Sequence, residues 1–528
     1  MEKNKDFFAL EAGSGLFEAS DSSIGRITQD LSGKTWKMEK MRVGQGVSEG
    51  IHLLKSELSG NNFSWNAAQV PGDVYTDLFL AGELDDPFWG RNMGKAKWVQ
   101  EYEWWYNRAF NVDKNLIGKD IELIFEGVDF SCEVWLNQKY LGRHEGMYSS
   151  FSFQVTDLLD YSQPHVPVNL LTVKLDPPPK NQQNFAGMKH NFSGDYLTGL
   201  IPFGIWQPVK LVATNRLRLE NYRVEYDLHK NAATAVFYIE LSNLSDSVLE
   251  AELNVSMTGR DQQITHSEPL SVSPGTSVCT FSFEIEDPQL WWPYELGDPF
   301  LYDLNILIAD GKSILDSLSD KTGIRTITMQ MNPGFTEEES RIPWTFVING
   351  KPMFLRSACW GGQPSFFYGR NSTPKYRMFL EKAKEANINN LRIFGWHPAE
   401  TDEFYTICDQ LGITVWTNFS FATQEFKTDQ PYIEKVTKEI QSTVIKRRNH
   451  PSNIMWMGGE EVYFTEAHVE SGNKQLMEYI GEVTHQLTNT PYADASPLSS
   501  REAIRMGYAT KESMHANSHY YAAGAIFM

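Results

Sequence analysis

A change in hydrophobic period near residue 323 constrains the fold more than any other feature of this sequence. Before it, short stretches alternate apolar and polar residues, as half-buried β-strands do. After it, apolar runs of strand length alternate with segments whose apolar residues recur every three or four positions, the period of a helix. Repeated strand–helix alternation is typical of parallel strands joined by right-handed crossovers. The chain is therefore expected to combine all-β domains with an α/β domain.

The α/β region, residues 323–528, contains six candidate strands and four candidate helices. The strands are expected within PMFLRSACW, INNLRIFGW, ITVWTNF, NIMWMGG, PYADAS and MHANSHYY. One helix is expected to begin at Thr373, and the other three are expected to cover residues 402–411, 431–447 and 473–488. Six strands in a row favour an incomplete (β/α)8 barrel, with a doubly wound sheet as the alternative from the pattern alone. Because such a barrel closes with eight strands, we expect the chain to be a fragment.

Three segments precede the α/β region. Residues 1–30 are polar, with clusters of glycine, serine and aspartate, and are expected to form a loose leader. Residues 31–215 contain alternating strands such as those in IELIFEGVDFSCEVWLNQKYLG and predict an all-β sandwich. Residues 216–322 have strands spaced as in a small immunoglobulin-like sandwich.

Composition narrows the classes of partner. The net charge of −20 argues against nucleic acid and anionic membranes, both of which need basic surfaces. No apolar stretch approaches the roughly 18 residues of a membrane span. The aromatic content of 13% suits either sugar-stacking surfaces or aromatic-rich sandwich cores. The four cysteines have no metal-binding spacing and are expected to be buried free thiols: Cys132, Cys279, Cys359 and Cys408.

The sequence contains no clear export signal at its N-terminus, MEKNKDFFALEAGSG. A cytoplasmic location is therefore expected, and a periplasmic or secreted protein is the alternative if an export signal is missing from this chain. The oligomeric state is open, with a homodimer among the candidates.

Two adjacent glutamates follow the fourth strand of the α/β region. In NIMWMGGEEV, four large apolar residues precede Gly458 and Gly459, which are expected to let the backbone turn before Glu460 and Glu461. Carboxylates just past a buried parallel strand lie where α/β enzymes place their chemistry. Adjacent residues of an extended chain point in opposite directions, so these two are not expected to flank one bond as an acid and a nucleophile.

Eight motifs run through the chain in a characteristic order: VPGDVYTDLFLAGELDDPFWGRN, EWWYNRAF, GIWQPVKL, LWWPYELGDPFLY, GIRTI, NGKPMFLRSACW, RIFGWHPAETDEFYTICDQLGITVWTNF and HPSNIMWMGGEE. Together they resemble glycoside hydrolase family 2, and within it the β-mannosidase branch. The resemblance runs from about residue 31 to the end of the chain. It implies a jelly-roll sugar-binding domain, an immunoglobulin-like domain and a TIM barrel. It also implies a carbohydrate substrate and carboxylate chemistry that requires no cofactor or metal.

The resemblance assigns roles at the end of the fourth barrel strand. The family's Trp-x-Gly-x-Asn-Glu falls on Trp456, Gly458, Glu460 and Glu461, which makes Glu461 the general acid/base and Trp456 an expected sugar contact. Glu460 stands where the family usually has an asparagine whose amide bonds the sugar 2-hydroxyl. An anion there favours the protonated form of the acid/base but removes an amide donor. The family's nucleophile is a glutamate ending strand seven, so it is expected beyond Met528.

Four further candidates lie near the ends of the barrel's first and second strands. Arg392 matches the family's Arg-x-Trp-Gly-Gly-Gly, in which Trp396 and His397 replace two glycines and would crowd the site. Trp360, after the first barrel strand, is expected to line the sugar pocket. Each residue also has an ordinary structural explanation, which is an ion pair for Arg392 and loop or core packing for the rings.

Two more candidate sugar contacts come from other loops of the family. Asp195 falls on the aspartate of the branch's Gly-Trp-Asp-Trp loop, although an aspartate there could simply cap a turn. His519 resembles the histidine of the family's strand-six His-Tyr-Trp. Three other acidic residues are expected to be structural: Glu403, Asp409 and Asp494.

The expected function is a retaining exo-β-mannosidase that hydrolyses β-mannosides at the non-reducing end. One alternative is another family 2 exo-β-glycosidase, of the exo-β-glucosaminidase or β-galactosidase type, in which Glu460 would be a counter-charge for a substrate ammonium group. The other is a non-catalytic or truncated carbohydrate-binding homologue. For want of its nucleophile, the chain as given is expected to be inactive.

Overall fold

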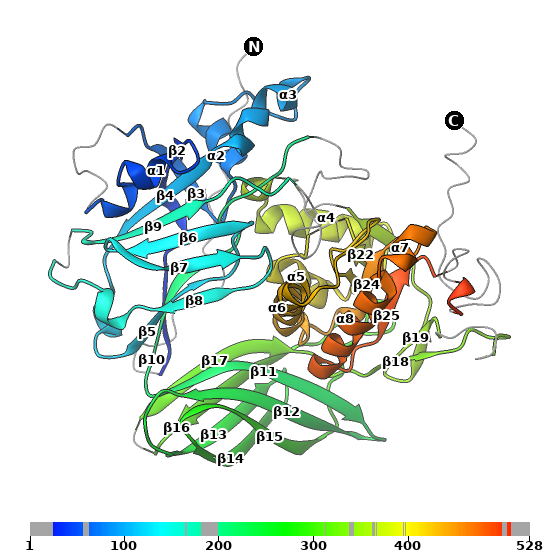
Figure 1. Cartoon of the computed structure of the whole chain (residues 1–528). Coiled ribbons are helices and arrows are strands. Elements are labelled where there is room, and N and C mark those ends of the chain that lie inside the picture. The colour runs from blue at the N-terminus through cyan, green and yellow to red at the C-terminus, as the bar shows by residue number, and fades with distance from the viewer. Residues whose placement is uncertain are drawn as a thin grey trace.

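The computed structural model describes most of the chain, namely residues 25–55, 63–163, 166–180, 199–311, 313–336, 343–361, 365, 367–393, 395–396, 398–498 and 504–507. Its residues form two β-sandwiches and an α/β domain, and each of the three contacts the other two (Figure 1). This multidomain architecture confirms the fold class predicted from the sequence. Among the described residues, no helix is both long and apolar enough to cross a membrane.

The first sandwich packs a six-stranded sheet, in the order β3-β2-β4-β9-β6-β7, against a four-stranded sheet, β1-β10-β5-β8. The strands are β1 (Ile27–Asp30), β2 (Gly33–Met41), β3 (Asn66–Val70), β4 (Glu103–Phe110), β5 (Asp120–Phe125), β6 (Ser131–Leu136), β7 (Lys139–Glu145), β8 (Phe151–Gln154), β9 (Asn169–Leu175) and β10 (Val209–Thr214). Three short helices flank them: α1 (Gln45–Ser48), α2 (Val74–Ala81) and α3 (Asn92–Ala96).

Strand β1 corrects the prediction that residues 1–30 are a loose leader. Residues 27–30 pair antiparallel with β10 and belong to the sandwich. Four residues are too few to show a strand period in the sequence, and the pairing depends on β10, which lies about 180 positions later in the chain.

The second sandwich packs the sheet β11-β12-β15 against the sheet β14-β13-β16-β17. Its strands are β11 (Leu217–Leu228), β12 (Ala232–Asn243), β13 (Leu249–Thr258), β14 (Gln263–Val272), β15 (Gly275–Glu286), β16 (Tyr302–Ala309) and β17 (Ile314–Thr322). Along β12 every second residue is buried, which is the alternation expected of a sheet with one face on the core.

The α/β domain begins with a small antiparallel sheet of β18 (Ile327–Gln330), β19 (Thr345–Ile348) and β20 (Lys351–Met353). Its parallel sheet contains β21 (Ser357–Trp360), β22 (Asn390–Ile393), β23 (Thr414–Asn418), β24 (Asn453–Glu460) and β25 (Tyr492–Ser496). The helices are α4 (Thr373–Glu385), α5 (Asp402–Leu411), α6 (Gln430–Arg447), α7 (Glu466–Glu470) and α8 (Asn473–Leu487).

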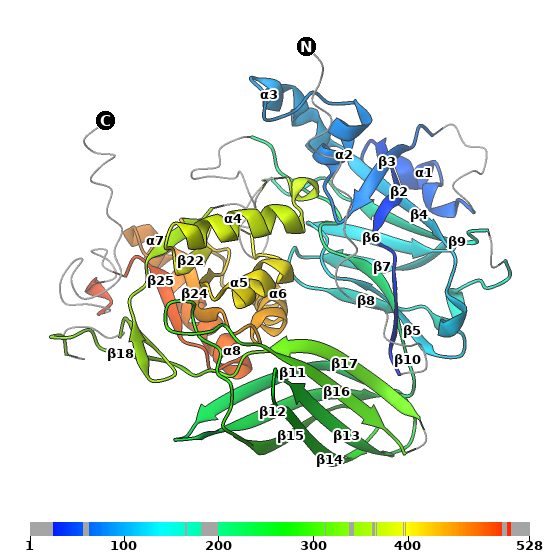
Figure 2. The same ribbon diagram turned by 180° about the vertical axis from the view of Figure 1, so that it is seen from behind.

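The parallel strands pair in sequence order, β21-β22-β23-β24-β25. Helix α8 lies beside β24 and β25 (Figure 2). A doubly wound sheet changes direction beside its first strand, as in the order 2-1-3-4-5, so the sequential order favours the barrel. The four predicted helices are confirmed at α4, α5, α6 and α8. The predicted sixth strand, within MHANSHYY, lies outside the described residues.

Three local expectations are corrected. PMFLRSACW is divided into β20, in an antiparallel hairpin, and the parallel strand β21. The chain does not turn at Gly458 and Gly459, because β24 continues through both to Glu460. A Cβ at Gly458 would overlap the Asp494 carbonyl oxygen, so this glycine permits close packing against β25. The four cysteines are free, but Cys359 is exposed.

Candidate active site

Glu461 lies immediately after β24, at the carboxyl edge of the parallel sheet. Its N–H donates to the Ser496 carbonyl at the end of β25, over 2.7 Å. Its φ of 53° is in the left-handed region, where a non-glycine residue is uncommon and costs backbone strain. The turn predicted at the two glycines therefore occurs here. The Glu461 side chain that follows this turn is half-buried, and its carboxylate accepts a hydrogen bond from the Thr423 hydroxyl over 3.2 Å.

Glu460 points to a different set of partners. Its Oε2 accepts from Arg392 Nη2 on β22, and the side chains of the pair are 5% and 12% exposed, respectively. The Asn418 amide, on the intervening strand β23, lies against both, and in either orientation its oxygen accepts a hydrogen bond from the guanidinium. The Arg392 guanidinium also lies 5.4 Å from the centre of the Trp416 ring. The positive charge of Arg392 therefore neutralises the Glu460 carboxylate within the sheet.

The loop after β23, residues 419–423, holds the end of β24 by backbone hydrogen bonds. The Glu460 N–H donates to the Phe421 carbonyl over 2.8 Å, and the Thr423 N–H donates to the Glu460 carbonyl over 2.9 Å. Gly395, after β22, completes this contact, since a Cβ there would lie 2.6 Å from the Glu460 Cβ and from the Phe421 oxygen. The two glutamates are thus fixed by main-chain contacts from three strand ends.

Two predicted sugar contacts lie on the helix side of the sheet instead. Trp456 is fully buried, stacks on Phe419 at 5.2 Å and packs among residues of α6 and α8. The half-buried Trp360 packs against Phe404 and Tyr376. These contacts account for both indoles as packing groups, and their roles as sugar contacts stay predictions. Trp396 is half-buried beside Gly395, and its role as a contact stays a prediction.

Glu400 is a buried carboxyl that no sequence motif singled out. Its two oxygens accept hydrogen bonds from the Trp360 indole N–H and the Tyr376 hydroxyl, each over 2.7 Å. Burial raises the pKa of Glu400 to about 7, although these two donors act in the opposite direction. This glutamate fixes the Trp360 ring.

His468 on α7 is a second residue that motif comparison missed. Its imidazole is hydrogen-bonded to the Glu461 backbone, and burial lowers the pKa of His468. A lone histidine on a short polar helix carries no sequence signal, and its proximity to Glu461 arises only from the fold. Its position supports the strained turn at Glu461.

Three candidate residues, Asp195, His397 and His519, lie outside the described residues, so their roles stay predictions. Asp409, expected to be structural, accepts from the Ser452 N–H and lies 2.6 Å from His450 Nδ1. Asp494 accepts a 3.4 Å bond from the Tyr463 hydroxyl. Within the part of the chain that the structure describes, no group of three or more histidine, cysteine or acidic residues is arranged to hold a metal ion.

Comparison with known proteins gives matches along most of the chain. Residues 50–207 match the glycosyl hydrolase 2 galactose-binding domain-like family, residues 217–325 match glycosyl hydrolases family 2, and residues 345–480 match the TIM barrel domain of that family. Each matched segment corresponds to one of the domains described above.

Individual relatives are similar at low sequence identity. A β-mannosidase B of Emericella nidulans is 28% identical over 439 residues, 79% of this chain and 50% of that protein. A β-mannosidase of Rattus norvegicus is 25% identical over 88% of this chain and 57% of that protein. The crystal structure of a β-D-mannosidase from Dictyoglomus thermophilum superposes with a TM-score of 0.77 and 26% identity, covering 90% of this chain and 58% of that one. The chain therefore spans about half the length of the relatives it matches.

Proposed function

The chain belongs to glycoside hydrolase family 2, and from this premise we propose that it acts as a retaining exo-β-mannosidase with Glu461 as the general acid/base. The substrate is a carbohydrate with a β-mannoside at its non-reducing end. The proposal of mannose draws on the relatives, which are β-mannosidases. The proposal for the residue draws on one observation, the half-buried Glu461 carboxylate at the carboxyl edge of the parallel sheet.

The chemistry assigned to Glu461 is proton transfer. In the first step its carboxyl group gives a proton to the glycosidic oxygen while a second carboxylate attacks the anomeric carbon, and in the second step it takes a proton from the attacking water. Glu460 does not serve as that second carboxylate, because it is paired with Arg392. We propose that the nucleophile comes from outside residues 1–528, in line with the family's strand-seven glutamate.

The pairing of Glu460 with Arg392 also bears on the choice of sugar. The exo-β-glucosaminidase hypothesis requires Glu460 to contact a substrate ammonium group. Here its Oε2 accepts from a guanidinium, and the side chain is 5% exposed. This arrangement favours a neutral sugar over an amino sugar.

The test is hydrolysis of p-nitrophenyl β-mannoside, β-glucosaminide and β-galactoside by this chain and by a chain extended past Met528 to include a strand-seven glutamate. We expect the extended chain to prefer the mannoside and Glu461→Gln to lose at least about 100-fold in kcat/KM. With 2,4-dinitrophenyl β-mannoside, whose leaving group needs no proton, the first step of the variant should be nearly normal. Preference for another sugar would overturn the mannosidase proposal. An equal loss with both leaving groups in a burst-phase measurement would overturn the role of Glu461.

A further inference from the structure

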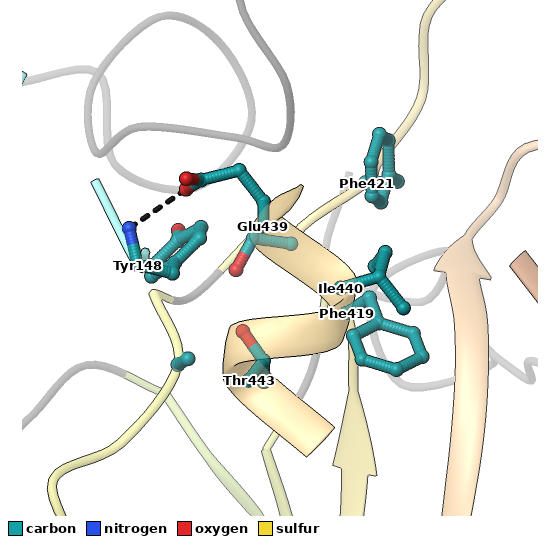
Figure 3. A pocket seen from close by; sticks show the side chains of 8 residues that line it. Tyr148, Phe419, Phe421, Glu439, Ile440 and Thr443 are labelled. Atoms are coloured by element: carbon teal, nitrogen blue, oxygen red, sulfur yellow. Dashed lines mark hydrogen bonds between the residues drawn. The ribbon is translucent and has the colours of Figure 1, made fainter. Parts of the chain in front are cut away.

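Glu439 joins the α/β domain to the first sandwich near the candidate site. It lies on α6 and is 5% exposed, and it faces the loop between β7 and β8 (Figure 3). Its carboxylate accepts from the backbone N–H groups of Met147, Tyr148 and Ser149 over 3.0, 2.7 and 3.1 Å, and from the Ser149 hydroxyl. Three successive N–H groups on one carboxylate form an anion-binding turn. A helix side chain of one domain thus holds the backbone of another.

The loop can approach this closely because residue 146 is glycine. Gly146 has a φ of 142°, and a Cβ there would overlap Glu439 Oε1. On its other side the loop is held by Trp206, whose indole N–H donates to the Met147 carbonyl over 2.9 Å. The 146–149 loop is therefore fixed from both domains.

The Tyr148 side chain links the 146–149 loop to the loop that follows β23. Its ring and Glu439 line a cavity of about 10 Å³, close to the size of one water molecule, together with Phe419, Ser420 and Phe421. The Tyr148 hydroxyl is hydrogen-bonded to the Ser420 side chain and to the Ala399 backbone. Figure 3 shows Tyr148 and Phe421 on either side of the Glu439 side chain.

The same loop orients both glutamates of the candidate site. The Phe421 carbonyl accepts the Glu460 N–H, and Thr423 bonds the Glu460 carbonyl and the Glu461 carboxylate. A continuous set of hydrogen bonds and packing contacts therefore runs from Glu439 through Tyr148 and residues 419–423 to Glu461.

We propose that Glu439 is a positioning residue for the candidate acid/base: it seats the 146–149 loop of the sandwich so that Tyr148 holds residues 419–423 in the arrangement that orients Glu461. The inference rests on the proposed function, because it concerns the orientation of the acid/base. It assigns the first sandwich a part in organising the catalytic edge of the barrel, besides any contact with sugar. A displacement of about 1 Å at a reacting group is enough to cost a large factor in rate.

The test compares Glu439→Gln with Lys435→Ala. Lys435 lies one turn earlier on α6 and pairs with Glu145, also across the domain boundary, but the side chains of that pair are 41% and 35% exposed. Tyr148→Phe is a second variant that keeps the Glu439 contacts and removes the hydroxyl. Hydrogen–deuterium exchange is measured at the amides of residues 146–149, Thr423 and Glu460, and kcat and KM are measured with p-nitrophenyl β-mannoside in the chain extended to include a strand-seven glutamate.

We expect Glu439→Gln to speed exchange on the order of tenfold at the 146–149 loop and also at Thr423 and Glu460. It should lower kcat about tenfold with KM within a factor of two, since the sugar contacts are retained. Tyr148→Phe should speed exchange at Thr423 and Glu460, and Lys435→Ala should match the wild type in every measurement. A purely structural role for Glu439 would instead lower the melting temperature and speed exchange at the 146–149 loop alone.

The two proposals fail in distinguishable ways. If the wild type hydrolyses none of the glycosides, the proposed function fails, and the exchange at Thr423 and Glu460 still decides whether Glu439 orders this loop. If the wild type is active while Glu439→Gln keeps its kcat and its exchange at Thr423 and Glu460, the positioning role is overturned and the proposed function stands.

Discussion

Arg392 and Glu460 form a buried ion pair across the parallel sheet, from β22 to β24, with the Asn418 amide of β23 between them. The glutamate stands where the family motif usually has asparagine. The pair explains how a carboxylate is accommodated at that position, because the guanidinium offsets the cost of burying its charge. The departure from the motif is therefore matched by a contact 68 residues away in the sequence.

Removing one partner of this pair should destabilise the barrel strongly. Arg392→Met leaves a buried carboxylate without its guanidinium, and we expect a loss of about 3–5 kcal/mol in the free energy of unfolding. The double variant Arg392→Met/Glu460→Met should recover much of this loss, since it removes both charges. Urea unfolding followed by tryptophan fluorescence measures both. The pair is not coupled if the loss of stability in the double variant equals the sum of the losses in Arg392→Met and Glu460→Met.

Gly458 should not tolerate a side chain. A Cβ would overlap the Asp494 carbonyl and the Tyr492 hydroxyl, so we expect Gly458→Ala to cost about 1–3 kcal/mol of stability. The matched control is Gly94→Ala in α3, where a Cβ meets nothing within 4 Å. Because alanine favours a helix over glycine, the control should gain up to about 1 kcal/mol. Equal effects of the two substitutions on the urea midpoint would contradict the close packing of β24 on β25.

The left-handed backbone of Glu461 should make this position a site where stability and activity conflict. Glycine adopts a φ of 53° at no steric cost, so Glu461→Gly is expected to raise the free energy of unfolding by about 0.5–1 kcal/mol while abolishing glycoside hydrolysis. Calorimetry and the mannoside assay test the two halves separately. A loss of stability in this variant would mean that contacts of the carboxylate outweigh the backbone strain.

Glu400 should make the stability of the α/β domain fall as the pH rises. Its pKa is raised from 4.5 to about 7 in the folded protein, so the folded state binds the proton more tightly than the unfolded state. This contribution is complete below pH 4.5 and is lost as the pH rises through about 7. Between these limits the stability of the wild type relative to Glu400→Gln should therefore fall, by on the order of 3 kcal/mol. The difference in the free energy of unfolding between the two proteins is measured by urea unfolding at about pH 5, 6, 7 and 8. Parallel curves would rule out a titrating Glu400.

The elements of the α/β domain could be predicted because their signals are local. A helix such as α6 displays its apolar face every three or four residues, and β24 is a continuous apolar run. The motif around Glu461 was equally local, and the structure places this residue at the sheet edge where the motif implied. The tryptophans were harder to place. A strand buried on both faces does not alternate, so nothing in the run Ile454–Met457 showed that Trp456 would point toward the helices.

The sequence by itself therefore determined the helices and most strands of the α/β domain, their order, and the position of one carboxylate at a strand end, because hydrophobic period and turn chemistry act between near neighbours. The tertiary structure alone decided which groups surround that carboxylate. Arg392 meets Glu460, and Glu439 meets the 146–149 loop, across 68 and about 290 residues of chain, respectively. Contacts at these separations depend on how strands pair within a sheet and how domains pack, and burial then sets the cost and the charge state of the groups that they bring together.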